Sequence, residues 1–345
     1  IMFPNFGITC HAPFLGHVAL GTGFLAGTTI VKSIEIHDLG DSEVFEVDGI
    51  YYNRTNRSTV SVTHGPQKYD GDVVIPSQVT YQGNTYDVTS IGSFAFLSND
   101  ELTSVAIPSS VTSIGASAFY CCYGLASITF PDQLTFIGNQ AFLSCNNLTS
   151  LTIPGSVTEI QSDAFIDCSG LTSITVEEGN TVYDSRDNCN AIIETSSNTL
   201  LCSCRNTVIP NTVTMIGAGA FRNCAGITSM TIPSSVTEIG SGAFSNCPDL
   251  TSVTIPNSVT DIGPSAFYYC SQLKSVVSEI TEPYDIYNVF DYIAEDATLY
   301  VPAGTMSKYQ DAEGWNSIAN IVEGSSGVTL SKTKATIEKG KTLTR

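Results

Sequence analysis

The sequence predicts a β-rich solenoid, in which short coils stack on one another and a cap closes each end. A segment of 23 residues recurs along the chain, in copies that start at Leu102, Leu125, Leu148, Ile227 and Leu250. Every copy keeps the same apolar positions, Leu-x-x-Val/Ile-x-Ile-Pro, then Val-Thr-x-Ile, then Ala-Phe and Cys. A fixed period of this length is typical of solenoid proteins, whose coils bury their apolar edges only by stacking.

The copy that starts at Leu102 predicts the three sides of one coil. Val105 and Ile107 alternate with Ala106, which is typical of a short strand with one buried face. Pro108 lacks a backbone donor and ends that strand. A second side follows over residues 111–114, and a turn or short 3₁₀ piece forms the third side with Ala118, Phe119 and Cys122.

These residues carry a family resemblance. The pattern Leu-x-x-Ile-x-Ile-Pro, Val-Thr-x-Ile-Gly, Ala-Phe and Cys resembles the leucine-rich repeats of BspA-like bacterial surface proteins, over about residues 73–322. The resemblance implies a right-handed leucine-rich-repeat solenoid, in the α/β horseshoe class, on an exported protein. It also implies adhesion, because the proteins that it resembles bind host matrix proteins or other cells.

The repeat phase divides the chain into five parts. Residues 1–42 do not fit the repeat, and they form either a leader or the remnant of an export signal that lacks a basic start. The tail changes abruptly to a basic composition and resembles the first strands of a bacterial immunoglobulin-like domain. The predicted parts are the leader 1–42, a β-hairpin cap and first partial repeat over 43–88, repeats over 89–272, a C-terminal cap over 273–323, and a linker with the incomplete immunoglobulin-like start over 324–345.

Local signals predict the irregular elements. Asp48-Gly49 and Gln82-Gly83-Asn84 are expected at hairpin turns in the N-terminal cap. Residues 171–226 span two periods plus ten residues, so we expect an insertion at about 177–205 with a hairpin around Ser196-Ser197-Asn198. An amphipathic helix over 303–321, with Trp315, is expected to close the last coil.

The cysteines predict a packed core rather than a disulfide framework. Six of the eleven recur at one repeat position, where Asn99 stands in the first coil. An obligate disulfide partner would not be replaced by asparagine, so free buried thiols are expected, with disulfides between neighbouring coils as the alternative. The six residues are Cys122, Cys145, Cys168, Cys224, Cys247 and Cys270.

Composition argues against catalysis and against nucleic acid. The four histidines, His11, His17, His37 and His64, all precede the repeats, so no Ser-His-Asp, Cys-His or His-ligated zinc arrangement is expected within them. The formal net charge of −19 repels phosphate backbones. No run is long and apolar enough to predict a membrane-spanning helix. We therefore expect a protein that is not an enzyme, has no cofactor and does not insert into a membrane.

One acidic cluster in the insertion is a candidate metal site. Carboxylates at close spacing are the ligands that calcium prefers, although no EF-hand spacing is present. A solvated loop is the alternative. The candidate ligands are Glu177, Glu178, Asp184 and Asp187, with Asn188 beside them.

A row of threonines predicts a flat, weakly charged contact surface. Threonine is also a good strand residue, and stacked threonines can hydrogen-bond between coils, so a structural role is the alternative. Irregular loops on a rigid scaffold commonly carry specificity, which adds the insertion and its tyrosine to the candidates. The predicted protein-binding residues are Thr129, Thr152, Thr175, Tyr183, Thr231 and Thr254.

The function expected from these features is adhesion or protein binding by a monomer at the bacterial surface or in the medium. The partner would be a host or bacterial surface protein, including a matrix protein. Glycan binding is the alternative, and it requires exposed aromatic side chains. The repeats offer Tyr120, Tyr123, Phe136, Tyr183, Tyr268 and Tyr269, which form no ladder in the sequence.

Overall fold

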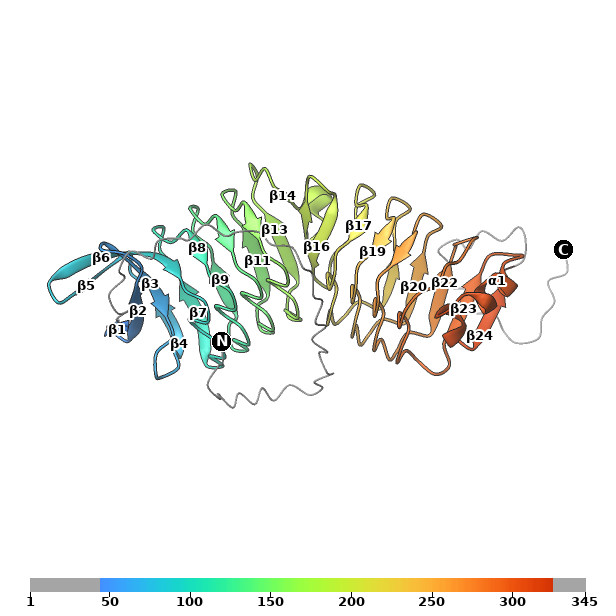
Figure 1. The fold of residues 1–345 in the computed structure, drawn as a ribbon, viewed down its shortest axis with the longest axis horizontal. Helices are drawn as coiled ribbons and strands as arrows, with labels where there is room; N and C mark the ends of the chain where they lie inside the picture. The colour runs from blue at the N-terminus through green and yellow to red at the C-terminus, as the bar shows by residue number, and fades with distance from the viewer. Residues whose placement is uncertain (1–43, 325–345) are drawn as a thin grey trace, which may run out of the picture. The chain divides into compact units, whose positions relative to one another are not determined.

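The computed structural model describes residues 44–324. The predicted leader and the immunoglobulin-like start at residues 328–345 lie outside this range and stay predictions. Within residues 44–324 the chain forms stacked coils with little helix, which confirms the leucine-rich-repeat solenoid. Figure 1 shows the strands of successive coils side by side in chain order.

Each regular coil contributes one strand to each of two parallel rows. The longer strands are β7 (Leu102–Ala106), β9 (Ser127–Thr129), β11 (Ser150–Ile153) and β13 (Ser173–Val176). The shorter strands are β8 (Ser113–Ile114), β10 (Phe136–Ile137) and β12 (Glu159–Ile160). Residues one period apart pair in register, as Ile114 does with Ile137, so the sequence period becomes the hydrogen-bonding period.

The third side of each coil is a turn, which we call the turn edge, and it buries one phenylalanine. The rings of successive coils stack with centroids 4.8 Å apart for Phe96 and Phe119, 4.9 Å for Phe119 and Phe142, and 5.3 Å for Phe142 and Phe165. The later coils repeat this at 4.7 Å, 5.0 Å and 5.5 Å. We call these residues the phenylalanine row: Phe96, Phe119, Phe142, Phe165, Phe221, Phe244, Phe267 and Phe290.

The N-terminal cap confirms the two predicted hairpins. Strands β1 (Val44–Val47) and β2 (Ile50–Arg54) are antiparallel around the Asp48-Gly49 turn, and β3 (Thr59–Thr63) pairs with β2. Strand β5 (Gln78–Tyr81) folds back on β6 (Asn84–Ile91), which continues into the shorter strand row by pairing with β8. Strand β4 (Gly71–Val74) starts the longer row beside β7.

The C-terminal cap differs from the prediction. The helix expected over 303–321 is wrong in length, because α1 covers only Met306–Asp311 and η2 only Trp315–Ser317. Gly304 and Gly314 take positive φ angles and interrupt helix at either side of α1. Strands β22 (Ser275–Ser278), β23 (Thr298–Val301) and β24 (Asn320–Glu323) extend the sheet instead. The closing role of Trp315 is confirmed, since it is fully buried against Phe290 at 5.5 Å.

Both strand rows stop at residues 171–226, which we call the interrupted coil. One sheet ends at β12, and the next begins with β14 (Tyr183–Asp184), β15 (Ala191–Glu194) and β16 (Thr199–Ser203) before β17 (Met215–Ile216), β19 (Glu238–Ile239) and β21 (Asp261–Ile262). The other row ends at β13 and resumes with β18 (Ser229–Thr231) and β20 (Ser252–Ile255). The hairpin predicted around Ser197 is confirmed by β15 and β16. The buried core also divides here into two clusters.

Candidate functional site

The predicted threonine face lies on the longer strand row. Thr129, Thr152, Thr175 and Thr231 are exposed, and Thr254 is half-buried. The Oγ1 atoms of Thr152 and Thr175 lie 3.1 Å apart, so neighbouring threonines also bond to each other across coils. The face is divided twice, because β9 and β11 belong to different sheets and so do β13 and β18, on either side of the interrupted coil.

Tyr183 is not part of this surface, and its prediction as an exposed contact residue is wrong. Its side chain is buried with 4 % exposure, and its Oη accepts a hydrogen bond of 2.8 Å from the backbone N–H of Ile160. Burial raises the pKa of its hydroxyl. The insertion lies outside the repeat phase, so the sequence does not show which of its side chains are buried.

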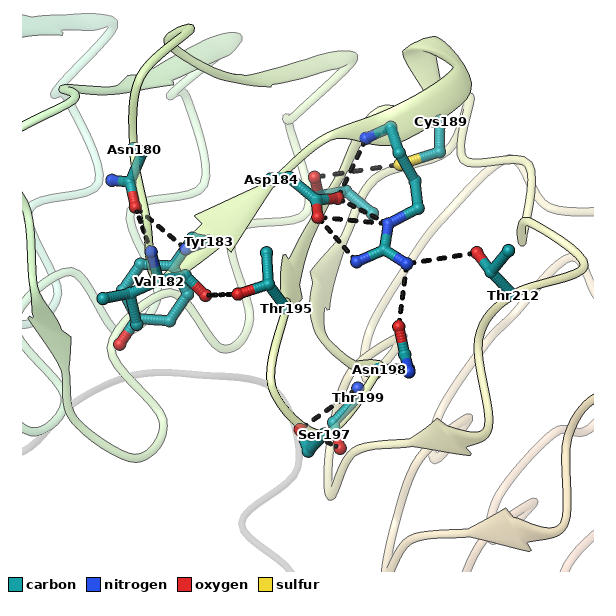
Figure 2. A network of polar contacts seen from close by, with 12 residues as sticks. Asn180, Val182, Tyr183, Asp184, Cys189, Thr195, Ser197, Asn198, Thr199 and Thr212 are labelled. Atoms are coloured by element: carbon teal, nitrogen blue, oxygen red, sulfur yellow. Dashed lines mark hydrogen bonds and ion pairs between the residues drawn. The ribbon is translucent and has the colours of Figure 1, made fainter.

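Asn180 fastens the start of the insertion to the preceding coil. Its Nδ2 donates to the carbonyls of Pro154 and Val157 at 2.9 Å and 3.0 Å. Figure 2 shows its Oδ1 accepting from the backbone N–H groups of Val182 and Tyr183, at 2.9 Å and 2.8 Å. These hydrogen bonds tie the segment after residue 178 to the preceding coil.

The candidate calcium ligands do not converge. Asp184 is held by Arg186, with Nη2 and Oδ2 2.6 Å apart, and Glu177 accepts a hydrogen bond from the backbone of Gly155 at 3.0 Å. Glu178 and Asp187 are exposed. No group of three or more acidic, histidine or cysteine side chains in residues 44–324 is arranged to hold a metal ion. Arg186 also donates to Asn198 and Thr212, so this part of the network is an internal tie (Figure 2).

The turn edge of the interrupted coil is shortened. Seven residues lie between the isoleucine and the cysteine of a regular coil, as between Ile137 and Cys145, but only three lie between Leu200 and Cys204. Hydrogen bonds set this alignment, since Gly217 donates to the Leu200 carbonyl as Gly138 does to Ile114. Ser203 then donates to the Ala220 carbonyl at 3.1 Å, the bond that a phenylalanine makes in other coils. The phenylalanine row therefore lacks one member.

A hollow of about 270 Å³ lies at this shortened edge, between the coils of Phe165 and Phe221. Ile192, Leu201 and Cys202 contribute apolar walls. Asp167 and Arg222 also line the hollow and form an ion pair across it, with 3.3 Å between Oδ1 and Nε. Burial raises the pKa of the Asp167 carboxyl, and Arg222 opposes this shift.

A second, more open hollow of about 640 Å³ lies where the longer strand row is interrupted. Arg205, Val208, Met230 and Thr231 are among its lining residues, and Val208 is 71 % exposed. The backbone N–H of Val208 donates to the Cys189 carbonyl at 3.0 Å, so the segment that carries Val208 is not paired with the longer strand row. We call the surface formed by Arg205, Val208 and Thr231 the interruption groove.

Sequence reasoning missed both hollows. The signal was present in the count of residues between Leu200 and Cys204, but the equivalence of these two residues to the repeat isoleucine and cysteine follows only from hydrogen bonds. The missing Ala-Phe of this coil was visible in the sequence, whereas its consequence, a hollow rather than local repacking, required the three-dimensional arrangement.

A model of BspA-type leucine-rich repeat regions matches the chain in six copies, over residues 77–192 and 191–292. The chain belongs to the BspA-type leucine-rich repeat family. None of the curated proteins matches it. Within residues 44–324, no helix has the length and apolar character needed to cross a membrane.

Two solved structures with TM-scores above 0.5 support the fold. A leucine-rich repeat protein from Eubacterium ventriosum is 24 % identical, with 73 % of this chain and 76 % of that chain covered and a TM-score of 0.54. The pneumococcal vaccine antigen PcpA is 16 % identical, with 82 % and 97 % covered and a TM-score of 0.51. A leucine-rich cell surface protein from Faecalibacterium prausnitzii is 26 % identical, with 83 % and 96 % covered and a TM-score of 0.38.

Proposed function

We propose that this chain is a non-enzymatic repeat protein, secreted or displayed on a bacterial surface, that binds a partner protein through the interruption groove and the adjoining threonine face. Membership of the BspA-type family supports a binding role of this kind. The observation that carries the assignment to this surface is the groove itself, where the longer strand row is interrupted between β13 and β18 and the apolar side chain of Val208 is left exposed.

The residues of the groove suit a protein partner. Val208 offers apolar area at 71 % exposure, and Arg205 offers a cation on a chain with a net charge of −19. Asn206 donates to the Thr172 carbonyl at 2.9 Å, which fixes the groove to the coil of Thr175. Rigid irregular segments that carry an exposed apolar anchor and a polar rim are favourable binding surfaces.

Val208→Asp tests this proposal, with Val44→Asp as its control. Val208 is 71 % exposed and Val44, on β1 in the N-terminal cap and outside the longer strand row, is 51 % exposed, so both substitutions place the same charge at an exposed valine. Binding is measured by surface plasmon resonance to purified extracellular-matrix proteins and by adherence of coated beads to host cells. Val208→Asp should weaken binding at least tenfold, about 1.4 kcal/mol.

Three results would overturn the proposal. The first is that neither matrix proteins nor cells bind the wild-type chain. The second is that Val208→Asp binds as well as wild type, and the third is that both variants lose binding to the same extent. Circular dichroism confirms that each variant is folded before binding is compared.

A further inference from the structure

Three tyrosines meet on the turn edge of the last coils. The ring centroids of Tyr268 and Tyr292 lie 5.2 Å apart, those of Tyr269 and Tyr292 5.7 Å apart, and those of Tyr268 and Tyr269 6.1 Å apart. Tyr292 is 64 % exposed, and the other two are half-buried. The sequence predicts no ladder among the aromatic residues of the repeats, and this cluster includes a further residue, Tyr292, from a coil in which the sequence pattern has decayed.

The backbone under two of these tyrosines is left-handed. Tyr269 and Tyr292 both have φ of 60°. Most preceding coils place small polar residues at the equivalent position, and Ser144, Asp167, Asn223 and Asn246 have φ between 55° and 64°. Asparagine and aspartate adopt this conformation readily, whereas a bulky residue does so at a cost.

Packing does not account for tyrosine at position 292. Tyr292 is mostly exposed, so its ring contributes little buried area to the fold. Two successive coils nevertheless accept the unfavourable conformation. A strained backbone conformation that the surrounding structure maintains without gain in packing is a reason to look for function.

Polar groups continue the same edge. Asn246 occupies the left-handed position of the coil that precedes Tyr269. Its N–H donates to the Tyr268 carbonyl at 2.7 Å, and its Nδ2 donates to the side chain of Asn223. Tyrosine combines an apolar ring face with a hydroxyl that donates and accepts hydrogen bonds. The three rings are tilted relative to one another, at 33°, 45° and 76°, so they offer both faces and edges beside the amides. This combination suits a pyranose, which has apolar C–H faces and a rim of hydroxyls.

We propose that Tyr268, Tyr269 and Tyr292, with Asn246, form a binding platform for a neutral glycan. The two hollows described above do not include these residues, so the platform is a separate surface from the interruption groove. The net charge of −19 disfavours anionic polysaccharides.

Affinity electrophoresis in gels that contain soluble neutral polysaccharides, a β-glucan, a xylan and a mannan in turn, tests this platform. Wild-type protein should be retarded by at least one of them. Tyr292→Ala should weaken the apparent affinity at least fivefold. Tyr287→Ala is the matched control, because Tyr287 is 70 % exposed but takes part in none of the ring contacts of the cluster.

Tyr292→Asn separates binding from folding. Asparagine is the residue that Asn246 provides at the equivalent position, so the thermal midpoint of this variant should equal or exceed that of wild type while the retardation is lost. Tyr292→Phe keeps the ring and should retain most of the retardation if stacking dominates.

The proposal is overturned if no neutral polysaccharide retards the wild-type chain, if Tyr292→Ala is retarded like wild type, or if Tyr287→Ala loses as much. Binding of a protein partner through these tyrosines, without any glycan retardation, would also overturn it. The Val208→Asp variant keeps the platform and should be retarded normally, so failure here and failure of the proposed protein-binding function are distinguishable.

Discussion

The regular coils over residues 102–170 and the interrupted coil over residues 171–226 use the same repeat in two ways. In a regular coil the phenylalanine stacks on its neighbour, and the cysteine thiol donates to a backbone carbonyl of the preceding coil, as Cys145 does to Phe119 at 3.1 Å. In the interrupted coil, Ser203 takes the hydrogen-bonding position of the phenylalanine, and the Cys204 thiol reaches Asn190 instead.

This difference shows that the turn edge behaves as a unit. Compared with a regular coil, the interrupted coil has four fewer residues between Leu200 and Cys204. It therefore lacks the phenylalanine, the backbone carbonyl of that phenylalanine and the left-handed turns all at once. Each of these features finds its partner in the adjacent coil, so none can be kept alone. A local shortening therefore changes the surface, while the Leu200 to Gly217 bond keeps the stack continuous.

The largest expected effect comes from the phenylalanine row. Phe142 is stacked on both sides, at 4.9 Å and 5.3 Å, whereas Phe165 has a ring on one side and the hollow near the other. Phe142→Ala should cost about 4–5 kcal/mol and Phe165→Ala about 3 kcal/mol in the free energy of unfolding. Urea denaturation followed by circular dichroism measures both, and equal losses would contradict the contrast between the two coils.

Turn glycines should show the next largest effect. A Cβ on Gly138 would lie 2.6 Å from the backbone nitrogen of Ala116 and 2.7 Å from the carbonyl carbon of Gly115, while a Cβ on Gly155 would meet nothing closer than 3.5 Å. Gly138→Ala should therefore destabilise by about 1–3 kcal/mol, since packed backbone must move. Gly155→Ala is the control and should stay within about 0.5 kcal/mol in thermal and urea unfolding.

Gly217, the turn glycine of the interrupted coil, allows a direct comparison with Gly138 of a regular coil. A Cβ on Gly217 would approach only the Leu200 carbonyl oxygen closely, at 2.8 Å. Gly217→Ala should cost less than Gly138→Ala, and the reverse order would show that the interrupted coil is packed as tightly as the regular ones.

The buried thiols predict a loss of stability in alkali. Burial raises the pKa of Cys122, Cys168 and Cys224 to about 12. Below the ordinary thiol pKa of about 8.5, both folded and unfolded states keep the proton and the contribution is constant. Above it the unfolded state ionises first, so each thiol should lower the free energy of unfolding by about 1.4 kcal/mol per pH unit until the folded pKa is reached.

Cys168→Ala isolates this contribution. Its urea unfolding should depend less on pH between 9 and 11 than that of wild type, by roughly the slope of one thiol. The six repeat cysteines are free and buried, so folded protein should also react slowly with thiol reagents. Rapid labelling of the native chain, or an unchanged pH slope, would contradict this.

The smallest expected effect concerns the ion pair of Asp167 and Arg222 at the hollow of the shortened turn edge. Asp167 has φ of 64°, and Asn223 and Asn246 occupy the equivalent position in other coils. Asp167→Asn removes a carboxylate whose pKa burial raises, and it keeps a residue that tolerates the left-handed conformation. Thermal unfolding near pH 7 should show a change of less than about 1 kcal/mol, in the stabilising direction. A large loss would mean that the ion pair with Arg222 holds the two coils together.

The sequence by itself determined the architecture. A period of 23 residues with constant apolar positions requires stacked coils, because a single coil cannot bury its own apolar edge. The hairpin turns, the buried thiols and the stacking of Phe142 on Phe165 follow from local chemistry or from spacing, and the structure confirms each of them.

Only the tertiary structure decided which irregular residues face solvent. The sequence predicts Tyr183 on the surface, but it is buried. Val208 and Tyr292 are exposed, and no sequence pattern predicts this. Where the repeat is regular, each residue's environment is known from its neighbours one period away. Where the period fails, burial depends on hydrogen bonds between segments that are distant in sequence, such as Tyr183 with Ile160 and Val208 with Cys189, and no local pattern records them.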